Sequence, residues 1–387
     1  RAAAAGRRDS ETPLGMAGLC IGVNALYLIP GGVGGTEIYL RSLLRALAAI
    51  DDQNQYVVFT NEETGGDLVP EARNFHWSPQ QVQAVNRPAR IFWEQCRLPA
   101  SIRRERLDVV LKPGFTAPLW CDAPQVSVFH DLQHKRRPEL FRWFDLPFWR
   151  FFLWQAARSS RRLIAVSQAT ADDLAHYYPR TARKVRVVRH GVDERLREIA
   201  AERRQRTPEP FVLCVSTLHP HKNICRLLRA FAEYQKGWPR WSLVLAGMKG
   251  FHANRVERLR RELGLAESVI VTGWIPREEI YDLYRRASAF IYPSTFEGFG
   301  MPVLEALAAG VPTACANIAP LREVAGMAAV YFDPLDVEAI FARLLDITQD
   351  GELRQCLSRD GPERAARFSW EKAAWETLET LREAVAT

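Results

Sequence analysis

The chain has 387 residues, of which 47% are hydrophobic and 25% charged. This balance is typical of a soluble globular protein and excludes a disordered chain, a collagen-like repeat and a small disulfide scaffold; the length predicts two or three domains. The 52 lysines and arginines exceed the 45 acidic residues, and the net charge of +7 favours anionic partners such as phosphates, nucleic acid or anionic lipid headgroups without choosing among them.

The cysteines and the apolar runs indicate the cellular compartment of the protein. The seven cysteines form no Cys-x-x-Cys pair, so we predict neither a zinc site nor a disulfide framework, and a reducing cytosol fits best. No window approaches the roughly 18 apolar residues that span a bilayer. The Ala/Arg-rich residues before Met16 lack the apolar core of a secretory signal and are left out of the fold prediction.

From Gly18 onward, short apolar runs alternate with helical stretches. Uninterrupted apolar strands between amphipathic helices are typical of parallel sheets covered on both faces, so we expect an α/β fold with doubly wound sheets. The predicted strands lie within residues 19–26, 55–60, 107–112, 125–130, 162–167, 184–189, 211–216, 241–247, 268–273, 288–294, 311–316 and 328–332.

Residues 193–210 separate two halves of similar size. They are charged, poor in large apolar side chains and end in prolines, which is typical of a linker between domains. Because open α/β sheets bind ligands at the carboxyl ends of their strands, we expect a site that draws on both halves across a cleft.

Two segments of the N-terminal half follow predicted strands directly. The glycine-rich stretch 30–35 comes after the first strand, and its glycines allow a ligand to approach the backbone closely, although the dinucleotide spacing GxGxxG is absent. His130 and Asp131 end a later strand. A single histidine in that place is more often structural, so the residues alone leave its role open.

Residues 134–163 are rich in aromatic side chains flanked by arginines. Such a basic, aromatic segment can rest on an anionic membrane surface. Phe148, Phe152 and Trp154 can equally form one buried face of a helix. Both interpretations stay open at this point.

Two loops of the C-terminal half carry groups suited to a diphosphate. Lys222 ends a proline-punctuated loop, where its ammonium could neutralise a leaving diphosphate, although most loop lysines are simply solvated. His219 and His221 beside it are expected at the surface. The stretch 288–316 predicts a strand, a glycine-bearing loop and a helix with Pro302 near its start, and the free amides of such a helix N-terminus suit phosphate.

Glu297 and Glu305 lie eight residues apart in this stretch. An isolated pair of that spacing is more often a solvated loop residue and a partner of the helix dipole. The complete string from Glu297 to Pro312, EGFGMPVLEALAAGVP, however, resembles the signature of the group 1 retaining glycosyltransferases, also called family 4. Segments that resemble mannosyltransferase-like members are WEQ at 93–95, FTAPL at 115–119, HDL at 130–132 and IAVSQATADDL at 164–174.

This resemblance extends from Cys20 to about Ala384 and implies the GT-B fold, in which two Rossmann-like, doubly wound domains face each other across a cleft. It implies that residues 18–195 form the acceptor side and residues 205–369 bind the nucleotide-sugar donor. Residues 370–387 would form a helix that crosses back to the N-terminal domain.

The resemblance also implies roles within the signature. Glu297 would contact the hydroxyls of the donor sugar, and Glu305 would accept hydrogen bonds from the nucleotide ribose. The backbone at Phe299, Gly300 and Met301 would meet the diphosphate.

Further site residues are implied outside the signature. Lys222 would stabilise the leaving diphosphate, and His130 would contact the transferred sugar. Many relatives carry an arginine about six residues before the lysine, where this chain has Ser216 and Thr217, so a hydroxyl, a backbone group or an arginine elsewhere must replace it. The remaining donor-binding candidates are Gly34 and Gly35 of the glycine-rich loop, and Gly273 and Ile275 beside the base.

We therefore expect an enzyme that transfers a sugar, with mannose from GDP-mannose favoured, to a glycan or polyprenyl-linked acceptor with retention at the anomeric carbon, in cell-surface polysaccharide biosynthesis. No Asp-x-Asp triplet offers the carboxylates that hold a donor-bound Mg²⁺ or Mn²⁺, so we predict no metal cofactor. The expected location is the cytoplasm, with the inner face of the cell membrane as the alternative raised by the basic, aromatic segment.

Three alternatives stay open. The first is a UDP-sugar-dependent glycosyltransferase of the same fold, and the second is another enzyme of the same architecture, such as a nucleotide-sugar epimerase or a phosphorylase. The third is a non-catalytic protein that binds nucleotides or anions. No motif of a nucleic-acid-binding module is present, so nucleic acid is not an expected partner.

Overall fold

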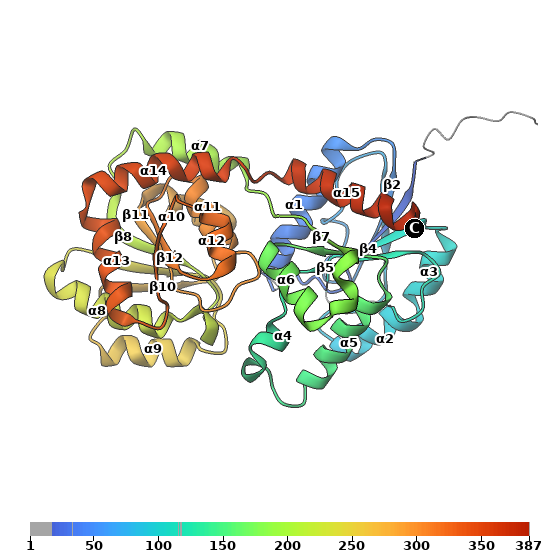
Figure 1. Ribbon diagram of the computed structural model, residues 1–387, viewed down its shortest axis with the longest axis horizontal. Helices are drawn as coiled ribbons and strands as arrows, with labels where there is room; N and C mark the ends of the chain where they lie inside the picture. Colours follow the sequence, from blue (N-terminus) through green and yellow to red (C-terminus); the bar gives the residue numbers. More distant parts are fainter. Residues whose placement is uncertain (1–17, 33, 115, 117, 387) are drawn as a thin grey trace, which may run out of the picture.

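The computed structural model describes residues 18–32, 34–114, 116 and 118–386. Within these residues the chain forms two α/β domains, each built around one sheet of parallel strands (Figure 1). The predicted α/β architecture with doubly wound sheets is therefore confirmed.

The N-terminal sheet has seven strands in the order β3-β2-β1-β4-β5-β6-β7. The strands are β1 (Cys20–Asn24), β2 (Gln55–Thr60), β3 (Phe75–Pro79), β4 (Val109–Lys112), β5 (Gln125–Phe129), β6 (Arg162–Ala165) and β7 (Val185–Val187). Its helices are α1 (Gly35–Ile50), α2 (Arg87–Cys96), α3 (Leu98–Arg104), α4 (Gln133–Arg136), α5 (Leu146–Ser159) and α6 (Gln168–Tyr177), with 3-10 turns at Pro138–Leu140 and Pro179–Lys184.

The C-terminal sheet has six strands in the order β10-β9-β8-β11-β12-β13. The strands are β8 (Glu209–Val215), β9 (Ser242–Ala246), β10 (Val269–Gly273), β11 (Ala287–Tyr292), β12 (Thr313–Ala316) and β13 (Val330–Phe332). The remaining helices are α7 (Glu194–Arg203), α8 (Ile224–Gly237), α9 (Ala253–Glu262), α10 (Arg277–Arg286), α11 (Met301–Ala308), α12 (Ala319–Ala325), α13 (Val337–Gln349), α14 (Gly351–Ala365) and α15 (Trp370–Ala386), with a 3-10 turn at Pro220–Lys222.

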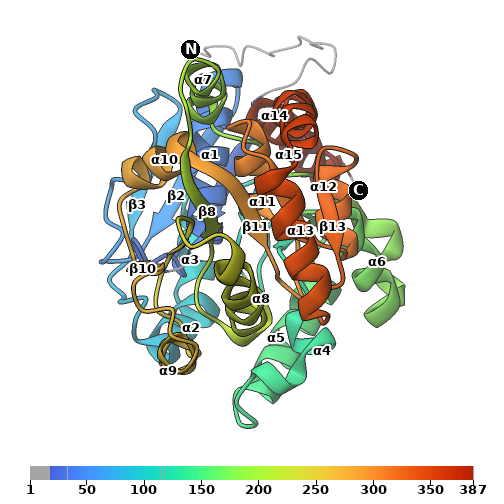
Figure 2. The same ribbon diagram turned by 90° about the vertical axis from the view of Figure 1, so that its left-hand side faces the viewer.

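Each sheet reverses its strand order once, between β1 and β4 in the first domain and between β8 and β11 in the second. Loops that leave the carboxyl ends of neighbouring strands diverge at such a reversal, which is where open α/β sheets place their ligands. The neighbours β8 and β11 (Figure 2) thus bring together loops that are far apart in the sequence.

Each of the twelve predicted apolar runs contains a strand, and β3 is a further strand that the sequence did not reveal. The central strands are buried on both faces, as all six residues of β11 are, and such strands read as uninterrupted apolar runs. By contrast, β3 is the edge of its sheet and three of its five residues are exposed. Half-exposed edge strands carry no continuous apolar signal.

The segment predicted as a linker is not irregular along its length, because α7 occupies its first half. Asp193 caps this helix by accepting a hydrogen bond from the Arg195 amide at 3.1 Å. The helix buries Leu196, Ile199 and Ala200 and packs against α10 and α11 of the C-terminal domain. Its narrow apolar stripe is hidden in a mostly charged sequence.

Helix α15 leaves the C-terminal domain and packs on the N-terminal one, against α1 and the strands β4, β5 and β6 (Figure 1). It buries Leu378 and Leu381 completely, and Glu383 pairs with Arg162 at 3.0 Å and with Arg186 at 2.8 Å. Among the described residues, no helix combines the length and the apolar character needed to cross a membrane.

A cluster of rings fills the junction between α1, α15 and the two sheets. His190 is 5% exposed, and its ring stacks on Trp370 with 5.7 Å between the ring centroids. The ring centroids of Tyr39 and Phe299 lie 4.9 Å and 4.6 Å from that of His190. Neither ring nitrogen of His190 has a hydrogen-bond partner in the described part of the chain. Burial, reinforced by neighbouring His130, therefore lowers the pKa of His190 well below its ordinary value of 6.5.

This junction predicts that acid destabilises the fold. The unfolded chain takes up a proton on His190 near pH 6.5, whereas the folded chain does not. The free energy of unfolding therefore falls as the pH drops below 6.5. The loss is up to about 1.4 kcal/mol per pH unit for each such histidine. We expect His190→Phe, which keeps the ring contacts, to show a shallower loss than the wild type between pH 7.5 and 5.5 in urea titrations. His176→Phe, at an exposed position of α6, is the control; identical pH profiles for His190→Phe and the wild type would contradict the assignment.

Candidate functional site

Lys222 and Glu297 meet at the strand-order reversal of the C-terminal sheet. Lys222 ends the turn after β8, and Glu297 lies in the loop after the neighbouring β11. The Lys222 ammonium donates to a Glu297 carboxylate oxygen at 2.6 Å and to the Tyr292 hydroxyl at 3.0 Å, and that hydroxyl donates to the same carboxylate oxygen at 2.9 Å. The two charged side chains are only 15% and 11% exposed. The structure thus brings together two of the three predicted catalytic residues and adds Tyr292, which the sequence did not single out.

The charge of this pair decides what the carboxylate can do. Burial by itself raises the pKa of Glu297, but the charge and the hydrogen bond of Lys222 outweigh it and hold the pKa below the ordinary value of 4.5. Glu297 is therefore ionised at neutral pH and can accept hydrogen bonds from hydroxyl groups. Burial raises the pKa of Asp131 in the other domain, and the negative charge of Glu297 adds to the effect. Asp131 thus lies within electrostatic reach of the pair.

His130 lies at the carboxyl end of β5, one residue beyond the strand. Its Nε2 is 2.9 Å from the Pro113 carbonyl oxygen, and because a carbonyl can only accept, this nitrogen carries the ring proton. Burial lowers the pKa of His130 to about 4. The imidazole is consequently neutral at pH 7, with its orientation fixed by the loop after β4.

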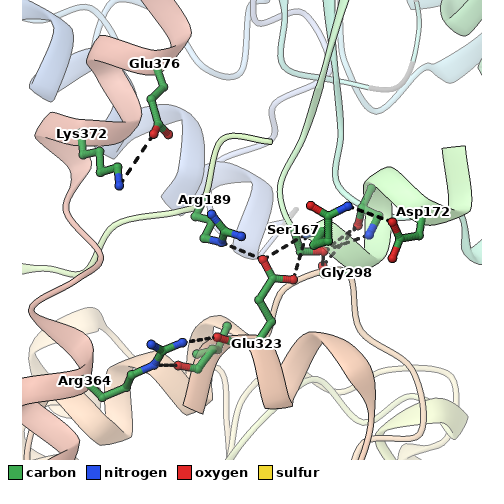
Figure 3. A network of polar contacts seen from close by, with 11 residues as sticks. Ser167, Asp172, Arg189, Gly298, Glu323, Arg364, Lys372 and Glu376 are labelled. Atoms are coloured by element: carbon green, nitrogen blue, oxygen red, sulfur yellow. Dashed lines mark hydrogen bonds and ion pairs between the residues drawn. The ribbon is translucent and has the colours of Figure 1, made fainter. Parts of the chain in front are cut away.

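The loop that carries Glu297 is held by the N-terminal domain. A Cβ at Gly298 would lie 1.7 Å from the His130 carbonyl oxygen, so only glycine fits there. The Gly298 carbonyl accepts hydrogen bonds from the hydroxyls of Ser167 at 2.6 Å and Thr170 at 3.2 Å (Figure 3). The two predicted halves of the site therefore touch through this loop, and the opposite domain helps to position Glu297.

A second set of contacts lies beside the first. Glu323 of α12 accepts from the Gln168 amide at 2.8 Å, at the start of α6, and from the Arg189 guanidinium at 2.7 Å (Figure 3). Further along, Nε2 of Gln133 is 3.1 Å from Nδ1 of His221. The expectation that His221 is a surface residue is thus wrong, because its ring is partly buried at the domain junction.

Helix α11 starts directly after this loop. Gly300 caps it with φ +107°, and a Cβ there would lie 2.4 Å from the Leu321 side chain, so both the backbone conformation and the space require glycine. Phe299 points into the core beside His190, which leaves its backbone as the part that can meet a ligand. The amides of Phe299 and Gly300, just before the helix, and of Met301, its first residue, lie at a helix N-terminus suited to a phosphate.

Glu305 is 4% exposed and is occupied by protein groups. Its carboxylate accepts from the Arg277 guanidinium at 2.6 Å and from the Tyr284 hydroxyl at 3.1 Å. A ribose would have to share this carboxylate with Arg277. Arg277 is the first residue of α10. Its only signal in the sequence was that it is a charged residue shortly after the end of a predicted strand.

The other predicted donor-binding positions lie around these groups. Gly34 caps α1 with φ +59°, Gly35 opens that helix, and a Cβ at Gly34 would lie 3.7 Å from Met248 of the C-terminal domain. The Ser216 hydroxyl donates to the Thr217 carbonyl at 3.3 Å. Neither Ser216 nor Thr217 supplies the positive charge of the arginine that many relatives carry there.

The predicted base site at the end of β10 contains an exposed tryptophan. Gly273 ends the strand with φ +73°, and Ile275 packs partly buried on the core. Trp274 between them is 62% exposed, and its indole lies 3.7 Å from where a Gly31 Cβ would stand. Sequence reasoning named the two flanking residues and missed the aromatic side chain itself.

No group of three or more His, Cys, Asp or Glu residues in the described parts of the chain could hold a metal ion. Metal independence stays a prediction. The seven cysteines are unpaired thiols.

Two family models match consecutive parts of the chain. "Glycosyltransferase Family 4" matches residues 33–196, and "Glycosyl transferases group 1" matches residues 197–364. The chain is 37% identical over 174 residues to the O-antigen chain mannosyltransferase B of Escherichia coli. The aligned region covers 44% of this chain and 45% of that protein. It is 30% identical over 276 residues to the MMP alpha-(1->4)-mannosyltransferase of Mycolicibacterium hassiacum, covering 67% and 65%. The match to the first relative thus spans less than half of that protein.

Solved structures agree on the architecture. The sucrose-phosphate synthase of Thermosynechococcus elongatus superposes with a TM-score of 0.76 at 20% identity, covering 95% of this chain and 99% of that one. The Anabaena protein HepE, solved with UDP and glucose, gives a TM-score of 0.74 at 20% identity, covering 94% and 99%. Together with the two family models, the signature from Glu297 to Pro312 and the two parallel sheets, these matches show that the chain belongs to the group 1, family 4 glycosyltransferases with the GT-B fold.

Proposed function

We propose that the protein transfers a hexose, with mannose from GDP-mannose favoured, from a nucleotide-diphosphate donor to a glycan or polyprenyl-linked acceptor. The observation that carries this proposal is the Lys222–Glu297 pair at the start of α11. An ammonium and the amides of a helix N-terminus supply positive charge where a departing diphosphate needs it. An ionised carboxylate beside them can bind sugar hydroxyls.

The choice of mannose and of a polysaccharide acceptor is supported by relatives. Proteins similar to this chain are named O-antigen chain mannosyltransferase B and serotype-specific mannosyltransferase, both from Escherichia coli. We extend the donor sugar and the class of acceptor from those proteins to this one. The reaction would belong to the biosynthesis of a cell-surface polysaccharide.

We propose substitution on one face of the sugar, with retention. A retaining glycosidase uses two carboxylates about 5 Å apart on opposite sides of the bond, whereas here Glu297 is held by Lys222 and Glu305 by Arg277. In the proposed step the acceptor oxygen bonds to the anomeric carbon as the bond from that carbon to the phosphate oxygen breaks. The acceptor proton passes to the departing phosphate oxygen, and Lys222 and the α11 amides stabilise the charge that remains.

Neutral His130 would face the transferred sugar rather than act as a nucleophile, and the hydrogen bond from its Nε2 to the Pro113 carbonyl would hold the ring in that orientation. Lys222 would exchange part of its contact with Glu297 for the donor phosphates. The ion pair thus keeps the lysine oriented before the donor arrives.

Two glutamate variants should separate chemistry from binding. Glu297→Ala should lower kcat by about 100-fold or more while the Kd for the nucleotide changes little, because the lost interaction is electrostatic and acts at the reacting sugar. Glu305→Ala should instead weaken nucleotide binding by about tenfold or more, since a charged hydrogen-bond acceptor is removed from the ribose. Steady-state kinetics and calorimetric titration measure the two effects.

Lys222→Ala should reduce kcat in the same assays, and Glu262→Ala, at an exposed position of α9, should leave both quantities unchanged. Wild-type behaviour of both Glu297→Ala and Glu305→Ala would refute the assignment of this site.

We also propose that the basic, aromatic segment 134–163 docks on an anionic membrane, where a polyprenyl-linked acceptor resides. Of the two interpretations left open by the sequence, a buried face formed by Phe148, Phe152 and Trp154 does not hold for Trp154, which is 44% exposed. Trp143 and Phe144 are 84% and 55% exposed. Guanidinium groups lie over two of these rings, Arg142 on Phe144 at 5.9 Å and Arg158 on Trp154 at 5.6 Å. Exposed aromatic rings with adjacent arginines suit an anionic interface.

Vesicle co-sedimentation tests this surface. The wild type should bind vesicles of anionic phospholipid, and added salt should weaken the binding because the charges are exposed. The triple variant Trp143→Ser, Phe144→Ser, Trp154→Ser should lose most of it. Phe251→Ser, at an 86% exposed position of the other domain, is the matched control. Equal sedimentation of the triple variant and the wild type would contradict the proposal.

A further inference from the structure

A cavity lies in the C-terminal domain, away from the Lys222–Glu297 pair. Its volume is about 360 Å³, which is in the range of small-molecule sites. Pro208, just before β8, Ser288, near the start of β11, and Pro312, just before β12, line it. These are the amino ends of the three strands, whereas the pair lies beyond the carboxyl ends. The six residues of β11 put about 20 Å between the two places.

Four arginines line this cavity. Arg203, Arg204 and Arg206 come from the end of α7 and the residues after it, and Arg354 comes from α14; Figure 1 shows these two helices on the same side of the domain. In the described part of the chain, no carboxylate lies within ion-pair distance of any of the four, and none lines the cavity. The side chains that line the cavity therefore carry a net positive charge.

Two carboxylates near the cavity have partners outside it. Glu202 of α7 is bonded to Arg195 at 3.2 Å and to Arg285 at 2.7 Å. The Asp350 side chain caps α14 by accepting from the Leu353 amide at 3.0 Å. Neither carboxylate forms an ion pair with an arginine of the cavity. The pKa of Glu202 is held below its ordinary value of 4.5 mainly by Arg285, and Arg206 adds to the effect from a greater distance.

Two of the arginines are held in place by backbone carbonyl groups. Arg203 is 9% exposed, and its Nη1 donates to the carbonyls of Tyr284 and Arg285 at 2.8 Å each. Arg354 donates through Nη1 to the Thr348 carbonyl at 3.2 Å. The Nε atoms of Arg203 and Arg354 are buried and have no partner among the described residues. Burial, and then the charge of Arg354, lower the pKa of Arg203 to about 10, so the two guanidinium groups repel each other while both stay charged at pH 7.

We propose that this cavity binds a small phosphorylated molecule of the size of a sugar phosphate. Guanidinium groups bind phosphate oxygens through paired, charge-assisted hydrogen bonds, and the negative charge of a phosphate would offset the repulsion between Arg203 and Arg354. The hydroxyls of Ser288 and Ser358 and the amide of Gln355 complete the lining and suit the hydroxyls of a sugar. Inorganic phosphate offers the same anionic chemistry but would leave much of the volume empty.

A ligand here would connect α7, which follows the crossing between the domains, with α14 of the C-terminal domain. It would do so without touching the donor site, since the sheet lies between the two. The site is therefore independent of the proposed sugar transfer.

Calorimetric titration with a hexose 6-phosphate and, separately, with inorganic phosphate tests the proposal. The wild type should bind the hexose phosphate more tightly than inorganic phosphate. Arg354→Gln and Arg204→Gln should each weaken the binding by about tenfold or more, the effect of losing a charge-assisted hydrogen bond. Arg204 is exposed, so Arg204→Gln keeps the test valid if Arg354→Gln fails to fold. Arg203 is left unchanged because it holds the end of α10.

Arg359→Gln is the matched control, since Arg359 lies on the same helix and pairs with Asp360 at 2.8 Å outside the cavity; its affinity should stay within about twofold of the wild type. GDP titration of Arg354→Gln should match the wild type. Absence of binding by both probes, or unchanged affinity in both Arg354→Gln and Arg204→Gln, would overturn the proposal. Equal affinity for the two probes would overturn the sugar phosphate as the ligand.

Discussion

The Gly298 carbonyl, on the loop that carries Glu297, is hydrogen-bonded by Ser167 and Thr170 of the opposite domain. The loop passes so close to the His130 backbone that position 298 has no room for a side chain. These contacts set the position of Glu297 relative to His130 and also the point from which α11 starts. A change in how the domains meet would therefore alter the ion pair and the helix N-terminus together.

The two edges of the C-terminal sheet differ in their balance of charge. At the carboxyl edge, Lys222 is balanced by Glu297 at 2.6 Å, so the site is close to neutral until a donor supplies phosphates. At the amino edge, Arg203 and Arg354 have no carboxylate partner in the described chain. We propose that the first edge binds the donor diphosphate and that the second binds a small phosphorylated molecule.

The extent to which the sequence predicts this structure follows from burial and from distance along the chain. Strands buried on both faces read as continuous apolar runs, whereas β3 at a sheet edge and α7 with its narrow apolar stripe do not. Local motifs pointed to Lys222 and Glu297 separately. The two residues are 75 positions apart in the sequence, and their contact depends on β8 lying beside β11. The pairing of Arg277 with Glu305 and the burial of His221 against Gln133 depend on tertiary packing that no local pattern contains.

Melting temperatures measured with GDP, UDP, ADP and their sugars, each with and without EDTA, test the central claim most directly, because a ligand that binds only the folded protein raises the melting temperature. The account predicts a shift that is selective for GDP and GDP-mannose and that survives EDTA, since Lys222 and the α11 amides are proposed to bind the diphosphate without a metal. A shift selective for UDP would contradict the proposed donor and keep the site. The absence of a shift with every nucleotide would contradict the claim that this site binds a nucleotide-sugar at all.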